Sequence, residues 1–179
     1  SMLSDVRAFA KVADALKNIN FYGVTVVAHD VPGEFHYPKE LAVAVENTSK
    51  HVEHGCHGTE MGKAFVRIAQ VVSGGEEELR KNPVVSAFGC PVSPLQFDRP
   101  NTEAMVECAK AGMPYDVLSM AMAGASSPVT LAGTLVIINA EVLAGTVICE
   151  LFSPGCPIIY GSVASIMDMR TGLLALGAP

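Results

Sequence analysis

Apolar and polar positions along the chain alternate between two patterns, which predict helices and strands in turn. The 3.6-residue pattern predicts helices at 6–16, 38–46, 59–72, 102–111 and 128–152. Short runs rich in apolar residues predict strands at 21–30, 50–52, 84–88, 115–120 and 157–160, and a charged turn is predicted at 76–81. Strands that alternate with helices through short connections are typical of a parallel α/β sheet.

The most apolar segment, 128–152, is predicted to be a helix. Ser126 or Ser127 can accept hydrogen bonds from the first helical N–H groups, and Pro128 suits the first helical position. Because the segment is apolar almost all round, we expect the helix to be buried. The strand predicted at 157–160 is continuously apolar, so we expect it to be covered on both faces.

Segment 128–152 is long enough to cross a membrane. However, Asn139 and Glu141 lie in its middle and Glu150 near its end, and carboxylates are costly in hydrocarbon. No basic residue lies within the segment to anchor it at a membrane surface. The sequence therefore favours a helix buried in a globular domain.

The order of elements is compatible with a barrel or a doubly wound sheet. No Gly-x-Gly-x-x-Gly motif follows the first predicted strand, which disfavours a dinucleotide-binding fold. Polar residues recur at the predicted C-terminal ends of strands, where barrels place their sites. A whole barrel needs about 250 residues. We therefore expect a partial TIM-like (β/α) barrel with parallel strands, about half of the eight units. We expect it to form one domain over 3–179 that is truncated at its C-terminal end, with residues 1–2 as a tag remnant.

Composition narrows the class of partners and the compartment. The formal net charge of −6 argues against nucleic acid and anionic membranes. Half of the residues are hydrophobic and 17% are charged, which gives a large core for one domain. The five cysteines are irregularly spaced, as expected for reduced thiols in the cytoplasm. No signal peptide is visible in the first residues.

Seven short motifs occur in order along the chain: NTSK at 47–50, GGEEELR at 74–80, PVSPL at 91–95, AGASSPVTLAGT at 123–134, NAEVLAG at 139–145, PIIYG at 157–161 and DMRTG at 168–172. As a set, which extends over about 14–179, they resemble the trimethylamine methyltransferase family, which includes glycine betaine methyltransferases. The resemblance implies a TIM-like barrel that transfers a methyl group from an amine to the cobalt of a separate corrinoid protein. In the trimethylamine enzymes a pyrrolysine takes part, and it lies beyond residue 179.

Six residues at predicted strand ends and in the loops that follow are candidates for binding the substrate: His29, Asp30, His57, Ser93, Met122 and Tyr160. Asp30 could face a cationic amine while His29 orients it or donates a proton, or the pair could simply cap a loop. Ser93 could bind substrate oxygens or serve only the geometry of its proline-rich loop. No residue is assigned a catalytic role.

Met122 and Tyr160 could each contact a methylated ammonium group. The thioether of Met122 could line a pocket for a methylammonium group or a corrinoid face, although such methionines are more often core residues. Tyr160 could present its ring to a quaternary ammonium ion. Asn139 and Glu141 are expected to bind backbone groups or neighbouring units rather than a ligand.

His51, His54, Cys56 and His57 form the only metal-like cluster in the sequence. Imidazole and thiolate groups suit zinc, but the spacing matches no closed zinc motif. We favour residues that line a cavity, and no metal ligand is assigned.

The sequence therefore predicts a fragment of a methyltransferase that moves a methyl group from a methylamine or glycine betaine to a corrinoid protein. Its expected partners are that protein, the small amine and further copies of itself. One alternative is a non-catalytic half-barrel that pairs through open sheet edges. A weaker alternative is a zinc-dependent methyltransferase.

Overall fold

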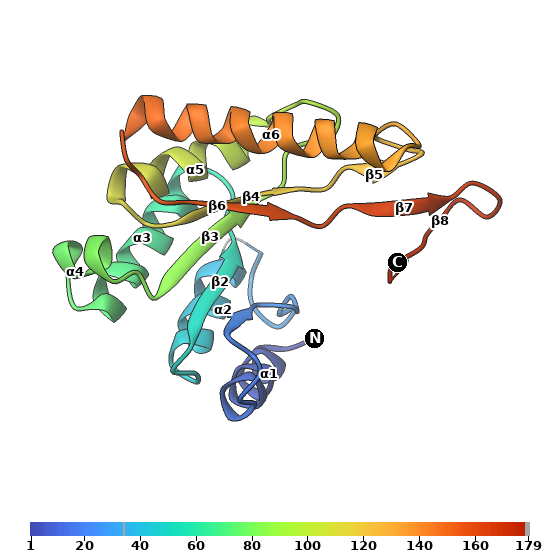
Figure 1. The fold of residues 1–179 in the computed structure, drawn as a ribbon. Coiled ribbons are helices and arrows are strands. Elements are labelled where there is room, and N and C mark those ends of the chain that lie inside the picture. Colours follow the sequence, from blue (N-terminus) through green and yellow to red (C-terminus); the bar gives the residue numbers. More distant parts are fainter. Residues whose placement is uncertain (34, 178–179) are drawn as a thin grey trace.

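A computed structural model describes residues 1–33 and 35–177 of the chain. Its main sheet has five strands, all parallel, in the order β1-β2-β3-β4-β6. The strands are β1 (Phe21–Gly23), β2 (His51–Gly55), β3 (Val85–Gly89), β4 (Tyr115–Ser119) and β6 (Ile158–Ser162). The sheet curls into half a barrel (Figure 1), which confirms the predicted partial (β/α) barrel with parallel strands.

Six helices accompany the sheet in the described residues: α1 (Leu3–Ala15), α2 (His36–Val45), α3 (Thr59–Ser73), α4 (Glu76–Lys81), α5 (Arg99–Ala111) and α6 (Leu131–Phe152). The longer helices pack side by side in chain order, α1 on α2, α2 on α3, α3 on α5 and α5 on α6. They cover the outer face of the sheet (Figure 1) and leave its concave face free of helices.

A second, smaller sheet extends from the edge of the first. It consists of β5 (Met122–Ala123), β7 (Ser165–Asp168) and β8 (Leu173–Leu174). Strand β5 pairs with β7 in parallel, and β7 pairs with β8 in antiparallel orientation. The chain runs almost straight from β6 into β7, so that this arm projects from the body beside α6 (Figure 1).

The hydrophobic core lies between the helices and the outer face of the sheet. Its largest fully buried apolar side chains are Tyr115, Phe65, Leu41, Leu79 and Met105. Helix α6 approaches β4 most closely at Gly145, where an added Cβ atom would lie 2.8 Å from both methyl groups of Val117. A glycine is required there because the helix backbone itself packs on the strand.

Helix ends follow local sequence signals. The side chain of Asp98 accepts the N–H of Asn101 at the start of α5, and Gly112 ends that helix at a positive φ of 73°. Gly74 ends α3 in the same left-handed region, with φ of 92°. Segment 76–81, predicted as a charged turn, is instead the short helix α4.

The first strand is much shorter than predicted. Only Phe21–Gly23 pairs with β2, whereas the prediction extended to Asp30. Val24 and Val26 leave the sheet but still pack against the core, so the apolar run continues after the strand has ended. His29 and Asp30 therefore do not lie at the end of a strand.

The start of the long helix also differs from the prediction. Helix α6 begins at Leu131, and the hydroxyl of Thr130 accepts the N–H of Gly133. Ser126 does not cap the helix, because its hydroxyl accepts the N–H of Met122 instead. Ser127 forms a hydrogen bond with the hydroxyl of Thr134, 2.9 Å away.

The prediction that α6 is buried all round is wrong. Only 28% of its most apolar 18 residues are buried, although by length and composition the helix could cross a membrane. Such a helix is weak evidence for a span, since core helices of globular proteins share these properties. Strand β6 likewise lies at the sheet edge with Ile159 and Tyr160 exposed, not covered on both faces. An apolar pattern indicates that a partner is needed but does not show whether one is present.

Replacing Gly145 tests the close packing of α6 on β4. Alanine favours helices over glycine by about 1 kcal/mol, but the new Cβ atom would overlap both Val117 methyl groups. We expect Gly145→Ala to lower the free energy of unfolding by about 1–2 kcal/mol in urea titrations. Val71→Ala, at an exposed position of α3, is the control and should change it by less than about 0.5 kcal/mol. A more stable Gly145→Ala protein would contradict the packing.

Candidate functional site

Polar side chains occupy corresponding positions on the concave face of the main sheet. Side chains along a strand point alternately to the two faces. Val117 on β4 contacts helix α6, so its neighbour Asp116 points to the concave face. The pairing of Asp116 with Phe88, and of Ser86 with Glu53, places Ser86 and Glu53 on that same face.

On this face, hydrogen bonds connect His51 and Glu53 of β2 to Ser86 of β3. Nε2 of His51 lies 2.8 Å from the hydroxyl oxygen of Ser86. The hydroxyl of Ser86 donates to Oε1 of Glu53 over 3.1 Å. Burial lowers the pKa of His51 and raises the pKa of Glu53, the latter partly offset by the bond from Ser86. Burial therefore disfavours the charged forms of both His51 and Glu53.

Asp116 is the buried acid of this cluster. Its side chain is only 5% exposed, and Oδ1 has no hydrogen-bond partner among the described residues. The carboxylate lies over Gly161 on β6, where an added Cβ atom would clash with it. Burial, followed by the negative charge of Glu53, raises the pKa of Asp116 to about 7. A carboxyl group that changes charge near neutral pH is a candidate functional residue.

A second buried pair, Glu40 and His54, lies on the opposite, helix-covered face. Oε2 of Glu40 on α2 is 2.7 Å from Nε2 of His54 on β2, and Oε1 accepts the N–H of Ala28. Burial lowers the pKa of His54, against the opposing effect of Glu40, and so favours the neutral ring. Burial opposes ionisation of Glu40, but the bonds from His54 and Ala28 outweigh it and lower the pKa of Glu40. The pair fixes the segment after β1 against α2 and β2.

Glu141, in the middle of α6, is the third buried acid. Its carboxylate accepts hydrogen bonds from the hydroxyls of Ser93 and Ser119 and from the backbone N–H of Leu95. Asn139 accepts the hydroxyl of Tyr160. The expectation that Asn139 and Glu141 bind neighbouring units is confirmed, and both tie α6 to adjacent elements.

The six residues predicted to bind substrate do not converge on one pocket. His29 and Asp30 are exposed near the start of α1, where Asp30 accepts the N–H of Leu3. His57 follows β2 and lies 2.7 Å from the side-chain oxygen of Asn101. Ser93 binds Glu141, Tyr160 is 57% exposed beside α6, and Met122 lies on β5. Their roles toward a substrate stay predictions.

The metal-like cluster of the sequence does not form a ligand set. His51 points to the concave face and binds Ser86, whereas His54 points to the helices and binds Glu40. Cys56 is buried in the core. In the part of the chain that the structure describes, no three His, Cys, Asp or Glu side chains are arranged to hold a metal ion.

Two open cavities lie near some of these side chains. One, of about 520 Å³, is lined by His57, Phe35 and Glu60 among others, beyond the end of β2. Another, of about 340 Å³, is mainly apolar and lies between α6 and the arm formed by β7 and β8. Neither contains the buried acid Asp116.

The sequence prediction missed Glu53, Ser86, Asp116 and Glu40. A signal for Ser86 and Asp116 was present, because each is a polar residue between apolar ones inside a short strand, whereas Glu53 lies between Val52 and His54 and has no such signal. The prediction from strand ends does not include them, because all three lie inside their strands. Glu40 lies in a helix, and nothing in its local pattern indicates that His54 will contact it.

The raised pKa of Asp116 predicts a pH dependence of stability. The folded-state pKa of Asp116, about 7, exceeds the ordinary value of 3.8. The contribution of this group to the stability of the folded state is therefore fully present only below about pH 4. The contribution is lost as the pH rises through about 7. We expect Asp116→Asn, which cannot ionise, to have a higher Tm than the parent at pH 8, by about 3 °C or more. At pH 4 the two melting curves should nearly coincide, and an equal difference at both pH values would contradict the assignment.

Comparison with known proteins identifies relatives over the whole chain. The family model described as trimethylamine methyltransferase (MTTB) matches residues 1–179. Trimethylamine methyltransferase MttB of Methanosarcina thermophila is 40% identical over 181 aligned positions, 100% of this chain and 38% of the relative. The Desulfitobacterium hafniense protein of the same name is 39% identical, over 98% of this chain and 35% of its own length. The glycine betaine methyltransferase of Desulfitobacterium hafniense strain Y51 is 35% identical, over 99% of this chain and 37% of its own length.

The chain thus spans somewhat more than a third of the length of these relatives and corresponds to their N-terminal part. The family match extends over residues 1–179, and this range includes the half-barrel strands that carry Glu53 and Asp116. The chain belongs to the trimethylamine methyltransferase family.

Proposed function

We propose that this chain forms half of the barrel of a methyltransferase that moves a methyl group from a methylamine or glycine betaine to the cobalt of a corrinoid protein. Relatives named for both amines match along essentially the whole chain, which supports this substrate class. The corrinoid is the methyl acceptor and arrives with its own protein. The corrinoid would provide the reactivity for methyl transfer, while this chain binds the amine and supplies negative charge beside it.

The observation that carries the proposal is the buried carboxylate of Asp116 beside Glu53 on the concave face. A quaternary ammonium ion has no N–H group, so a protein recognises it through charge and shape. A buried carboxylate oxygen without a hydrogen-bond partner is costly unless a cation or donor approaches it. Completion of the barrel would enclose this face and place the two acids in its interior.

A bound cation would change the protonation of the site. An opposite charge within a few ångströms favours the ionised form of a carboxyl group and lowers its pKa. Asp116, whose pKa is about 7, would then release its proton when the amine binds at neutral pH. Glu53 adds a second negative group to the same face.

The charge change in the reaction defines what the acids do. In a cationic substrate, glycine betaine or protonated trimethylamine, nitrogen keeps the electron pair when the carbon–nitrogen bond breaks and becomes neutral, while the reduced cobalt of the partner's corrinoid would supply the pair for the new cobalt–carbon bond. Because the positive charge on nitrogen decreases along this path, the carboxylates hold the substrate more strongly than the transition state. Asp116 and Glu53 therefore act in binding and orientation, and not in accelerating the chemical step.

The test uses the full-length gene product that contains this chain, assayed for methyl transfer from trimethylamine and glycine betaine to cob(I)alamin by its absorbance change. Asp116→Asn should raise KM for the amine about tenfold, equivalent to about 1.4 kcal/mol of binding, with a smaller change in kcat. Glu77→Gln, on the exposed surface of α4, is the control and should leave both unchanged. Absence of transfer from every methylated amine tested would refute the function. An unchanged KM in Asp116→Asn would refute only the assigned site.

A further inference from the structure

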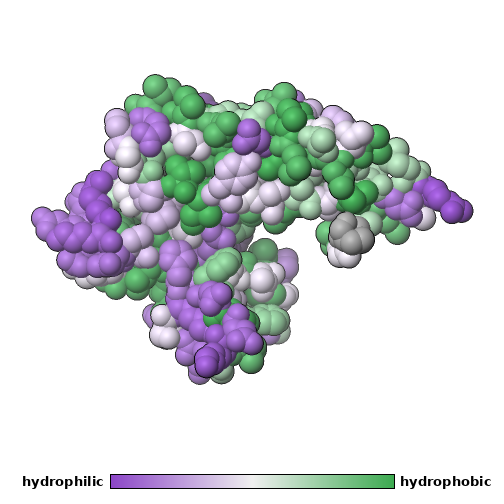
Figure 2. Space-filling view, in the orientation of Figure 1, coloured by the Kyte–Doolittle hydropathy of each residue, from purple (hydrophilic) through white to green (hydrophobic). Residues whose placement is uncertain are grey.

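The outward face of α6 is apolar along its whole length. Val136, Leu143 and Val147 are 66%, 51% and 58% exposed, and Ala140 between them is exposed as well. We call these four residues the outer stripe. Figure 2 shows hydrophobic surface along this helix, whereas the exposed end formed by α4 is hydrophilic.

The outer stripe lies opposite the face that packs on the sheet. With about 100° per residue, Thr134, Ile138, Glu141, Val142, Gly145 and Cys149 gather on the buried side, and the outer stripe is centred roughly 180° away. Helix α5 already contacts one flank of α6. A further barrel helix would cover the other flank, near Leu135 and Asn139. Closure of the barrel therefore leaves the outer stripe exposed.

We propose that the outer stripe is an interface for a second copy of this chain, with the two α6 helices packed antiparallel about a twofold axis. The spacing 136, 140, 143, 147 is the alternation of four and three residues through which two helices interlock. An axis between residues 141 and 142 sets Leu143 against Ala140 of the other copy and Val136 against Val147. Leu143 thus meets the smaller Ala140 and Val136 meets Val147, and each contact occurs twice, as in a self-complementary interface.

Charge favours the antiparallel orientation. Helix α6 contains no Lys or Arg, and its exposed acid, Glu150, lies near its C-terminal end. The same axis brings Glu150 next to Gly133 of the other copy, in the first turn of its α6. A carboxylate is stabilised there by the positive end of the helix dipole. A parallel pair would instead place the two Glu150 side chains together.

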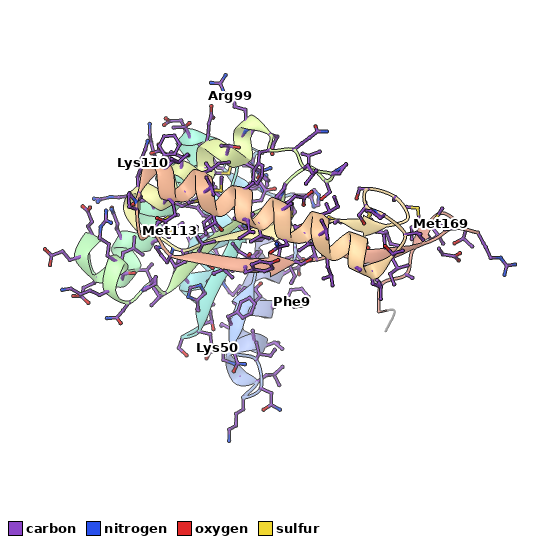
Figure 3. The ribbon with its side chains drawn as sticks, turned by 45° about the horizontal axis from the view of Figure 1, so that its top comes forward. Phe9, Lys50, Arg99, Lys110, Met113 and Met169 are labelled. Atoms are coloured by element: carbon purple, nitrogen blue, oxygen red, sulfur yellow. The ribbon has the colours of Figure 1, made fainter. Side chains whose placement is uncertain are left out.

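A membrane fits this face less well than a second copy. Helices that lie on membranes carry Lys or Arg beside their apolar face, and α6 has neither. The opposite face of α6 holds the buried Glu141 and packs on β4, so the helix is not free to insert. Lys110 of α5 lies beside the C-terminal end of α6 (Figure 3). It is already engaged, because it lies over the ring of Phe152 and pairs with Glu107.

The size of the face predicts a weak dimer. A 22-residue helix is about 33 Å long and about 10 Å wide, so the face measures roughly 330 Å² on each copy. Stable interfaces bury about 800 Å² on each partner. The dimer should therefore form at high protein concentration and dissociate on dilution.

Directed cross-linking tests the arrangement in the full-length gene product. A mixture of Val136→Cys and Val147→Cys proteins, distinguished by tags of different size, should form a mixed disulfide on mild oxidation. Each variant alone should not cross-link, because the two copies of position 136 lie about 16 Å apart along the antiparallel pair. The unsubstituted protein controls for its own cysteines, of which Cys56, Cys108, Cys149 and Cys156 are buried. No mixed product, or self-linking of Val136→Cys, would overturn the proposal.

Sedimentation over a series of protein concentrations provides a second test. Leu143→Glu should abolish the concentration-dependent rise in mass, while Val71→Glu, at an exposed position of α3, should retain it. Circular dichroism checks that both variants are folded. An unchanged mass profile for Leu143→Glu would overturn the proposal. Binding to anionic vesicles that Leu143→Glu abolishes would overturn it in favour of a membrane surface.

Discussion

The two-residue alternation of side chains along parallel strands is the constraint on which this structure depends. Val52, Ala87 and Val117 point outward and are buried beneath the helices. Their neighbours in the chain, Glu53, Ser86 and Asp116, must then point to the concave face. One-residue slippage of any strand would exchange the two sets and bring carboxylates into the apolar core. The packing that holds the helices on the sheet therefore also determines the chemistry of the interior.

The buried acids of the described residues differ in what surrounds them. Glu40 and Glu141 receive hydrogen bonds from side chains and backbone, and each joins a helix to a strand or loop. Asp116 has an oxygen without any such partner and lies beside another acid. The fold thus uses two of its buried carboxylates for structure and leaves the third able to respond to a ligand. This contrast separates the candidate site from other polar clusters.

The sequence predicted the order of the five main-sheet strands and the longer helices, and the half-barrel, because periodicity and short connections report local structure. It did not predict the small sheet of β5, β7 and β8. It failed where a partner decides the outcome. The apolar run after Gly23 looked like a continued strand because its valines pack on the core outside the sheet. Helix α6 looked buried, yet one face is exposed, since composition alone does not supply the element that would cover it. The site residues Glu53, Ser86 and Asp116 were not predicted because they lie inside strands, whereas barrel sites are expected at strand ends.

The most direct test of the central claim is the pKa of Asp116, measured from the pH dependence of its side-chain carbon resonance with and without tetramethylammonium. Without the cation, the carboxyl group should titrate near pH 7. With the cation, the midpoint should fall, because a bound positive charge favours the ionised acid. A midpoint near 4 in the free protein, or one that the cation leaves unchanged, would contradict the account.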